Sequence, residues 1–224
     1  MPHKVDHHAI LERNGGRNAF AFIDPARTAH LVIDMQRGFM DPGAPVEVPE
    51  ARTVVDNINR ISAAVRDGGG LNVFVQYTTP AANAPPWPVF MERLGVGADV
   101  HRAAFTRDAE LWQLWPGLDV QEGDLRVEKC RFSAFTPGAS DLNSVLRKGG
   151  IDNVIISGTL TNCCCESTAR DAMQLNYRVL FIADANAALS DEAHAATLGS
   201  MALAFADLYS TDEIVDLMQV KVPA

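Results

Sequence analysis

Asn153-Val154-Ile155-Ile156-Ser157-Gly158-Thr159-Leu160-Thr161-Asn162-Cys163-Cys164-Cys165-Glu166-Ser167-Thr168-Ala169-Arg170-Asp171-Ala172 is the stretch that indicates the fold. Its apolar start is typical of a buried strand, its small residues of a turn and its remainder of a helix. A fold of alternating strands and helices displays a nucleophile at such a turn, and Cys164 lies there. Unpaired backbone N–H groups and the helix dipole favour a thiolate in a first helical turn. The stretch therefore predicts an α/β fold with a reactive cysteine.

Strands and helices alternate along most of the chain outside this stretch. Apolar runs predict strands at 29–34, 71–77, 124–128, 153–157, 178–182 and 207–209. Helical spacing and capping residues predict helices at about 50–67, 141–148, 161–175, 191–205 and from 211 onward, with Ser190 as the N-cap of the helix at 191–205. We therefore expect a three-layer sandwich with a mainly parallel sheet of about six strands and right-handed crossovers.

Length and composition are those of one α/β domain. The chain has 224 residues, of which 47% are hydrophobic and 21% charged, enough to bury a full core. Residues 1–27 show no sustained periodicity and are expected to form an N-terminal arm before a domain at 28–224. Residues of about 80–123, rich in Pro and Trp, are expected to be an insertion that shapes the site.

The charge balance excludes two classes of partner. The formal net charge is −9 and there is no long Lys or Arg run, whereas nucleic acids and anionic membrane surfaces need clustered positive charge. The polar N-terminus lacks the apolar core of a signal peptide, and no apolar run is long enough to cross a bilayer. We therefore expect a cytoplasmic protein with no nucleic-acid or membrane partner.

Three of the four cysteines are contiguous, and Cys130 is the fourth. This arrangement suits neither a disulfide framework nor spaced zinc ligands, so we expect reduced thiols. The chain could alternatively use the four cysteines for redox sensing or soft-metal binding. Adjacent cysteines on one helix are poorly placed to hold one ion together, which disfavours that alternative.

Three ionisable residues follow different predicted strands. Asp34 follows the first strand, Lys129 the third and Cys164 the fourth, so all three fall at the edge where open parallel sheets bind ligands. A desolvated carboxylate can act as a base toward a thiol, and a nearby ammonium stabilises the thiolate. Each residue alone has a plainer interpretation: a turn-capping Asp, a solvated Lys or a small buried Cys.

Residues 28–218 resemble the isochorismatase-like cysteine hydrolases, which include nicotinamidases and N-carbamoylsarcosine, ureidoacrylate and biuret hydrolases. The resemblance lies in Leu31-Val32-Ile33-Asp34-Met35-Gln36 with Phe39, in Glu128-Lys129-Cys130-Arg131-Phe132-Ser133-Ala134-Phe135, and in 158–172. It implies that Asp34, Lys129 and Cys164 are the catalytic set. It also implies a cis peptide bond between Thr159 and Leu160, and an oxyanion hole made by the N–H groups of Leu160 and Cys164.

The resemblance further implies hydrolysis of a small linear amide or ureide through a thioester on Cys164, with ammonia or an amine released. We expect no cofactor and no metal, and a homo-oligomer, either a dimer or a tetramer. Phe39, Phe132 and Trp87 are expected to line the substrate pocket, although the same side chains could be core.

Departures from the family narrow the subclass. Nicotinamidases carry metal ligands in an Asp-x-His pattern with a further His, whereas this chain has Thr78-Thr79-Pro80-Ala81-Ala82-Asn83 after Tyr77. Isochorismatases generally lack the cysteine. The missing metal ligands disfavour a nicotinamidase, and the presence of Cys164 favours amide or ureide chemistry over that of an isochorismatase. Nicotinamidase and isochorismatase activity are kept as alternatives, as is a catalytically idle scaffold.

The remaining cysteines and histidines are given structural interpretations. Successive residues of an α-helix point about 100° apart, so we expect Cys163 and Cys165 to pack away from the pocket that Cys164 faces. His101 and His194 are isolated in the sequence and are expected to be surface or capping histidines.

Overall fold

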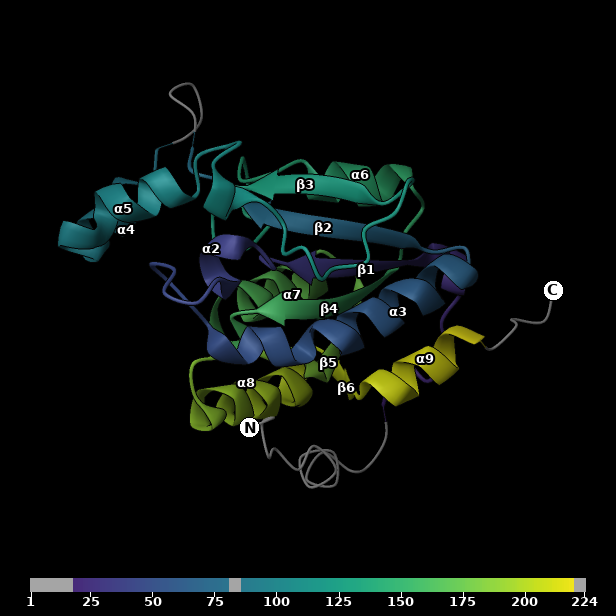
Figure 1. Ribbon diagram of the computed structural model, residues 1–224. Coiled ribbons are helices and arrows are strands. Elements are labelled where there is room, and N and C mark those ends of the chain that lie inside the picture. The colour runs from purple at the N-terminus through teal and green to yellow at the C-terminus, as the bar shows by residue number, and fades with distance from the viewer. Residues whose placement is uncertain (1–17, 81–85, 220–224) are drawn as a thin grey trace.

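A computed structural model describes residues 18–80 and 86–219, and six parallel strands form the sheet at its centre (Figure 1). The strands are β1 (Thr28–Ile33), β2 (Leu71–Tyr77), β3 (Leu125–Lys129), β4 (Asn153–Thr159), β5 (Arg178–Ala187) and β6 (Asp207–Tyr209). They lie in the order β3-β2-β1-β4-β5-β6. The chain thus starts in the middle of the sheet and winds outward in both directions.

Helices cover both faces of the sheet because its strands bury alternate side chains on each side. On β1, Leu31 and Ile33 join one apolar cluster, and Val32 joins the other. The first cluster is covered by α6 (Leu142–Lys148), α7 (Glu166–Gln174) and α8 (Asp191–Ala204). The second is covered by the 3-10 turn Pro49–Val54, α3 (Val55–Asp67) and α9 (Thr211–Gln219). The expected three-layer α/β sandwich is confirmed.

The predicted elements exist, with shifted ends. β5 runs to Ala187 because its pairing with β4 changes register between Ile156 and Gly158. Ser190 accepts a hydrogen bond from the Ala193 N–H at 3.2 Å, which confirms the expected N-cap of α8. The cysteines differ from expectation: residues 161–165 form a π-helical turn, and α7 begins only after it.

The connection from β2 to β3 occupies the segment that the sequence set apart at 80–123. Its described part contains the 3-10 turns Gly95–Gly97 and Glu110–Trp112 and two short helices, α4 (Pro88–Leu94) and α5 (Ala98–Ala104). Both helices project beyond the carboxyl ends of the strands (Figure 1), near the short helix α2 (Arg37–Met40) that follows β1. The segment is the crossover between two neighbouring parallel strands.

The expected N-terminal arm lies mostly outside the described residues, which begin at Asn18. Its described end lies along the last strand of the sheet: the Asn18 side chain donates to the Leu208 carbonyl at 3.1 Å, and the Tyr209 hydroxyl donates to the Phe20 carbonyl at 3.0 Å. Between residues 18 and 219, no described helix combines the length and apolar character that a membrane span requires.

Candidate active site

Close packing of β1 against β4 sets the position of the site. Gly158 lies opposite Ile33 in the sheet and has a φ of 122°. A Cβ at this position would come within 2.1 Å of the Ile33 carbonyl oxygen, so only glycine fits. Asp34 follows Ile33 directly, and the turn with Cys164 follows Gly158. The glycine thus lets the nucleophile turn approach the carboxylate.

Lys129 reaches Asp34 across an intervening strand. β3 and β1 are separated by β2, which corresponds to roughly 10 Å. The lysine side chain passes Tyr77 at the end of β2, with its Nζ 5.4 Å from the ring centroid. Nζ then donates to Asp34 Oδ2 at 2.7 Å and to the Arg131 carbonyl at 3.1 Å. Both charged side chains are fully buried.

The Asp34 carboxylate has the properties of a base in a desolvated site. Burial raises its pKa, whereas the Lys129 charge, the neighbouring Cys164 thiol and the hydrogen bond from Lys129 oppose that rise. One oxygen, Oδ2, is bonded to Lys129, but Oδ1 is buried without a hydrogen-bond partner among the described residues. Asp34 therefore has one oxygen available to accept a proton.

The Lys129 ammonium stays protonated. Burial alone lowers its pKa, but the charges of Asp34 and Cys164, together with hydrogen bonds to both side chains, outweigh that effect and raise it. Lys129 is thus a fixed positive charge that contacts both the carboxylate and the thiol.

Cys164 is held as a thiol in the free site. A hydrogen bond with Cys163, burial and the Asp34 charge raise the pKa of Cys164 well above its ordinary value, and Lys129 opposes them. The helix end that favours a thiolate at this position is opposed in the free protein by Cys163, by burial and by the Asp34 carboxylate. The Cys164 proton must move as the sulfur reacts.

The three contiguous cysteines have different surroundings. Cys165 is fully buried in the core, as expected. Cys163 packs against the same core but also lines a cavity together with Cys164, so the expectation that it only packs is wrong. The expectation assumed α-helical spacing, whereas the residues lie in a π-helical turn. The hydrogen bond with Cys164 lowers the pKa of Cys163.

Backbone donors lie next to the thiol. The Thr159–Leu160 peptide bond is cis, as the resemblance implied. The Leu160 carbonyl accepts from the N–H groups of Cys163 at 3.1 Å and Cys165 at 3.2 Å. The Leu160 N–H has no acceptor among the described residues. This free donor is one of the two that the resemblance assigns to an oxyanion hole.

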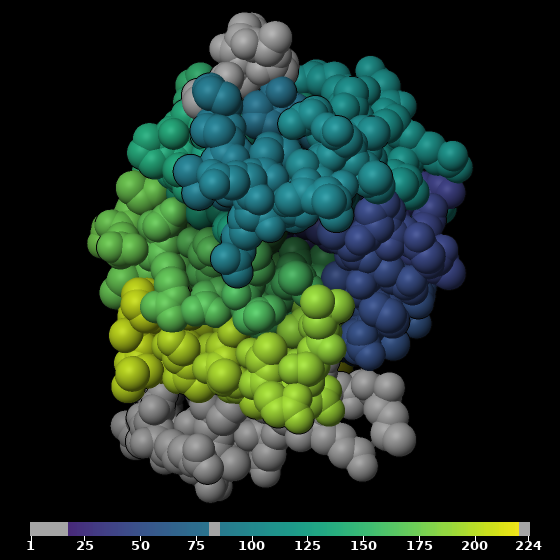
Figure 2. All heavy atoms as spheres, turned by 90° about the vertical axis from the view of Figure 1, so that its left-hand side faces the viewer, coloured from purple at the N-terminus to yellow at the C-terminus, as the bar shows by residue number. Residues whose placement is uncertain are grey.

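A cavity of about 620 Å³ opens beside Cys164 at the carboxyl edge of the sheet. Figure 2 views this edge and shows a hollow between teal atoms above, purple atoms to the right and green and yellow-green atoms below. The residues that line the cavity are Phe39, Ala44, Pro45, Val46, Glu47, Val48, Tyr77, Phe90, Leu94, His101, Phe132, Leu160, Cys163, Cys164 and Leu189. Most of these side chains are apolar.

The structure places two of the three expected pocket residues in this lining. Phe39 and Phe132 line the cavity, whereas Trp87 does not. Trp87 contacts two of the lining residues instead. Its ring stacks on Phe90 with centroids 4.3 Å apart and meets the Phe132 ring edge-on with centroids 4.8 Å apart. Phe90, in α4 of the segment between β2 and β3, also lines the cavity. This segment therefore helps to shape the site, as expected for residues 80–123.

Gln36 positions the end of β2, a contact that sequence reasoning missed. Its amide donates to the Tyr77 carbonyl at 3.0 Å and to the Trp112 carbonyl at 2.8 Å, and its Oε1 accepts from the Tyr77 N–H at 2.7 Å. Gln36 is two residues after Asp34 in the first matching motif. This position in the motif was the only sequence signal that Gln36 has a role at the site.

Both histidines that were expected to be surface or capping residues are buried. His101 lies among the rings of Tyr77, Phe90 and Phe105 and lines the cavity. His194 Nε2 is 3.0 Å from the Ala183 carbonyl, and its Nδ1 is 2.9 Å from the Thr161 hydroxyl. A carbonyl only accepts, so Nε2 carries a proton. His194 therefore ties the start of the nucleophile turn to β5.

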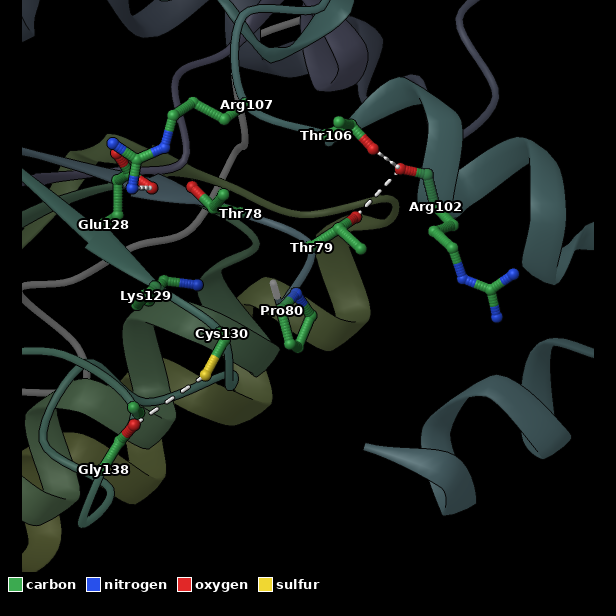
Figure 3. A pocket seen from close by; sticks show the side chains of 11 residues that line it. Thr78, Thr79, Pro80, Arg102, Thr106, Arg107, Glu128, Lys129, Cys130 and Gly138 are labelled. Carbon is green, nitrogen blue, oxygen red and sulfur yellow. Dashed lines mark hydrogen bonds and ion pairs between the residues drawn. The ribbon is translucent and has the colours of Figure 1, made fainter. Parts of the chain in front are cut away.

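A second cavity of about 520 Å³ has Lys129 in its lining (Figure 3). It contains neither Asp34 nor Cys164 in its lining. Its two arginines are paired: Arg107 with Glu128 at 2.9 Å and Arg102 with Asp99 at 2.7 Å. This cavity therefore reaches the lysine of the candidate catalytic set but neither the carboxylate nor the thiol.

The described residues do not fit the metal centre of the nicotinamidases. Thr78, Thr79 and Pro80 follow β2 where that pattern requires an Asp-x-His. Within the described ranges, no three His, Cys, Asp or Glu side chains are grouped so that they could hold an ion.

The isochorismatase domain model matches residues 28–213, which is most of the chain. The chain belongs to the isochorismatase family. It is 34% identical over 176 residues to an uncharacterised isochorismatase family protein, YwoC, of Bacillus subtilis, which covers 79% of this chain and 86% of that protein. The resemblance inferred from the three motifs is thereby confirmed.

Two relatives with named activities are similar at the same level. Nicotinamidase 3 of Arabidopsis thaliana is 34% identical over 186 residues, covering 83% of this chain and 86% of the relative. Ureidoacrylate amidohydrolase RutB of Pseudomonas savastanoi pv. phaseolicola is 31% identical over 204 residues, covering 84% and 82%. The two names describe different amide substrates, so similarity alone leaves the substrate open.

A solved structure shares the architecture of the whole domain. The crystal structure of a cysteine hydrolase from Pseudomonas syringae pv. phaseolicola superposes with a TM-score of 0.80 at 26% identity, covering 88% of this chain and 94% of that one. The all-parallel sheet with helices on both faces is thus the architecture of a known cysteine hydrolase.

Proposed function

We propose that this protein is a cysteine-dependent hydrolase that cleaves the C–N bond of a small linear amide or ureide through a thioester on Cys164. One observation carries the proposal: Lys129 donates to Asp34 at 2.7 Å, and Cys164, which interacts with both side chains, lines a cavity of about 620 Å³. The naming of two relatives as a nicotinamidase and a ureidoacrylate amidohydrolase supports amide chemistry.

The first half of the reaction forms the thioester. Asp34 Oδ1 takes the proton of Cys164 as the sulfur attacks the carbonyl carbon, and the raised pKa values of both groups suit that transfer. The N–H groups of Leu160 and Cys164 hold the oxyanion, an interaction of about 3 kcal/mol per donor in hydrolases. Asp34 then gives its proton to the nitrogen, the C–N bond breaks, and ammonia or an amine leaves.

The second half releases the acid. Water attacks the thioester carbon while Asp34 accepts one of its protons, the C–S bond breaks, and the proton returns to the sulfur. Lys129 stays protonated throughout and stabilises the carboxylate and the developing thiolate. Each proton that leaves one group is received by another, and the site returns to its starting state without a cofactor.

An ammonia-release screen tests the proposal. The purified protein is assayed with nicotinamide, simple aryl and alkyl amides, ureides and carbamoyl amino acids. Cys164→Ala and Asp34→Asn each reduce turnover by at least about 1000-fold, as single changes in a catalytic set do. Cys163→Ala and Cys165→Ala are the matched controls and retain much of the activity. Equal losses from all three cysteine substitutions would instead support the redox or soft-metal alternative.

The remaining proposals concern the partners, location and oligomeric state of the enzyme. We propose a small-molecule substrate, no nucleic-acid or membrane partner, a cytoplasmic location, and a homodimer or homotetramer. The projecting α4–α5 segment supports self-association because it exposes Val89, Val96 and Val100.

A further inference from the structure

The charges around the cavity disfavour an anionic substrate. Glu47 is the one lining residue that carries a full charge among those described; hydrogen bonding from the Gly43 N–H, followed by Arg52, lowers its pKa and keeps it ionised. No Lys or Arg belongs to the described lining. Residues 81–85, outside the described ranges, are Ala, Ala, Asn, Ala and Pro, none of which is ionisable.

The arginines and lysines near the cavity are engaged with other groups. Arg52 is ion-paired with Glu47 itself at 2.8 Å. Arg102 and Arg107 line the second cavity (Figure 3), and the Lys129 ammonium is directed to Asp34. The Arg131 guanidinium donates to the carbonyls of Cys130 and Pro86 at 2.7 and 3.0 Å and lies 5.0 Å from the centre of the Trp87 ring. Because Arg52 already pairs with Glu47, a substrate carboxylate in the Cys164 cavity would be desolvated with no cation of the described lining to pair with, which is unfavourable.

Two residues that line the cavity each carry a neutral polar atom with no hydrogen-bond partner among the described residues. Tyr77 and His101 both line it, with ring centroids 5.3 Å apart. The Tyr77 hydroxyl and His101 Nδ1 are buried without a hydrogen-bond partner among the described residues. Such atoms are normally satisfied, and leaving them unpaired is destabilising. Burial lowers the pKa of His101 to about 4, so the ring is neutral at neutral pH.

We propose, on the basis of the proposed function, that the substrate is an uncharged amide on a flat apolar body, and that Tyr77 and His101 recognise a neutral polar group on that body. Phe39, Phe90 and Phe132 provide aromatic walls for the flat part. A carboxylated ureide such as a ureidoacrylate does not fit this lining, although a relative with that activity is 31% identical.

Matched substrates separate this inference from the proposed function. Benzamide, hydroxybenzamides and carboxybenzamides differ only in the ring substituent, and ureidoacrylate is the carboxylated ureide. We expect kcat/KM for hydroxybenzamide to exceed that for carboxybenzamide or ureidoacrylate by about 100-fold. Equal or faster turnover of the carboxylated compounds overturns the inference and leaves the proposed function standing.

Binding to the Cys164→Ala protein, followed by calorimetry, gives a readout without turnover. We expect neutral amides to bind and carboxylated ones not to bind. Binding of neutral amides together with no ammonia release by the wild type overturns the proposed function and leaves the pocket chemistry standing. Preferential binding of the carboxylated compounds overturns the inference, whatever the wild type hydrolyses.

Two substitutions test the recognising residues. Tyr77→Phe and His101→Phe keep the ring contacts and remove one polar atom each. We expect KM for hydroxybenzamide to rise about five- to tenfold, with KM for benzamide unchanged. Because the Tyr77 hydroxyl has no hydrogen-bond partner in the described part of the chain, Tyr77→Phe does not lower the melting temperature.

Tyr177→Phe is the matched control. The Tyr177 hydroxyl donates to Asn143 at 2.8 Å, and Tyr177 packs in the core cluster on one face of the sheet. This substitution lowers the melting temperature and leaves both KM values unchanged. Two results overturn the assignment by showing a structural role only. One is a lower melting temperature of Tyr77→Phe with an unchanged KM for hydroxybenzamide, and the other is an equal rise in KM for benzamide and hydroxybenzamide.

Discussion

Lys129 donates a 2.7 Å hydrogen bond to Asp34, and neither side chain is accessible to solvent. The two residues are 95 positions apart in the chain and come from strands that are not neighbours. A buried ion pair is maintained by both of its members, because removal of one leaves an uncompensated charge. The pair is thus a structural unit as well as part of the proposed catalytic set.

The ion pair predicts non-additive stability. Lys129→Met leaves the Asp34 carboxylate buried without its cation and lowers the free energy of unfolding by about 3–5 kcal/mol. The double variant Asp34→Asn/Lys129→Met removes both charges and is less destabilised than Lys129→Met alone. Urea unfolding at pH 7 measures both values. Additive losses from the two substitutions contradict the pairing.

The close approach of β4 to β1 at Gly158 predicts that no larger residue is tolerated there. A Cβ on Gly158 would come within 2.1 Å of the Ile33 oxygen. Gly158→Ala therefore forces β4 away from β1, lowers the free energy of unfolding by at least about 3 kcal/mol and abolishes ammonia release.

Gly199→Ala is the matched control for that substitution. Gly199 lies in α8, and an added Cβ there meets no atom within 4 Å. The change stabilises the protein by about 0.5–1 kcal/mol through helix propensity and leaves activity unchanged. A Gly158→Ala protein with wild-type stability and activity contradicts the close approach of the two strands.

The cysteine turn predicts a shift in thiol reactivity. The hydrogen bond with Cys163 is the largest cause of the raised pKa of Cys164. Cys163→Ala removes that bond, so Cys164 becomes reactive toward iodoacetamide at a lower pH than in the wild type. Alkylation at a series of pH values, with the site read from peptide fragmentation, measures the midpoint. Cys165→Ala is the control and leaves the midpoint in place; a fixed midpoint in Cys163→Ala contradicts the prediction.

His30 predicts loss of stability in mild acid. The ring lies between Ser62 and Ser157, and burial lowers its pKa to about 3. The unfolded chain binds a proton below its ordinary pKa of 6.5, whereas the native ring stays neutral until about pH 3. Stability therefore falls as pH decreases below 6.5, and His30 accounts for about 2 kcal/mol between pH 8 and pH 5.

His30→Asn tests that assignment. The variant is less stable at pH 8 because it loses contacts, but it loses about 2 kcal/mol less than the wild type between pH 8 and pH 5. Thermal or urea unfolding at the two pH values gives the comparison. An unchanged loss assigns the acid sensitivity to other groups.

The sequence predicted the fold well because periodicity and strand-end residues are local signals. The six strands and the helices of both layers were expected from apolar runs and caps such as Ser190. The placement of Asp34, Lys129 and Cys164 at one edge followed from the parallel order of the strands. The motif resemblance then indicated the family and the cis bond before Leu160.

Features that depend on packing could not be predicted from the sequence. His101 and His194 look isolated along the chain, yet tertiary packing buries both. Cys163 was misplaced because the π-helical turn changes the direction of its side chain. Within the described residues the Tyr77 hydroxyl has no hydrogen-bond partner, and this depends on which groups lie nearby in space rather than on any local sequence pattern.

The most direct test of the central claim is to locate the acyl group on the enzyme during turnover of a neutral amide. The reaction is quenched in acid within a single turnover, and peptide fragmentation assigns the added mass. The account predicts an acyl mass on Cys164 that Cys164→Ala abolishes and Cys163→Ala retains. Hydrolysis of the amide with the acyl mass on Cys163, or with none on Cys164, would contradict it.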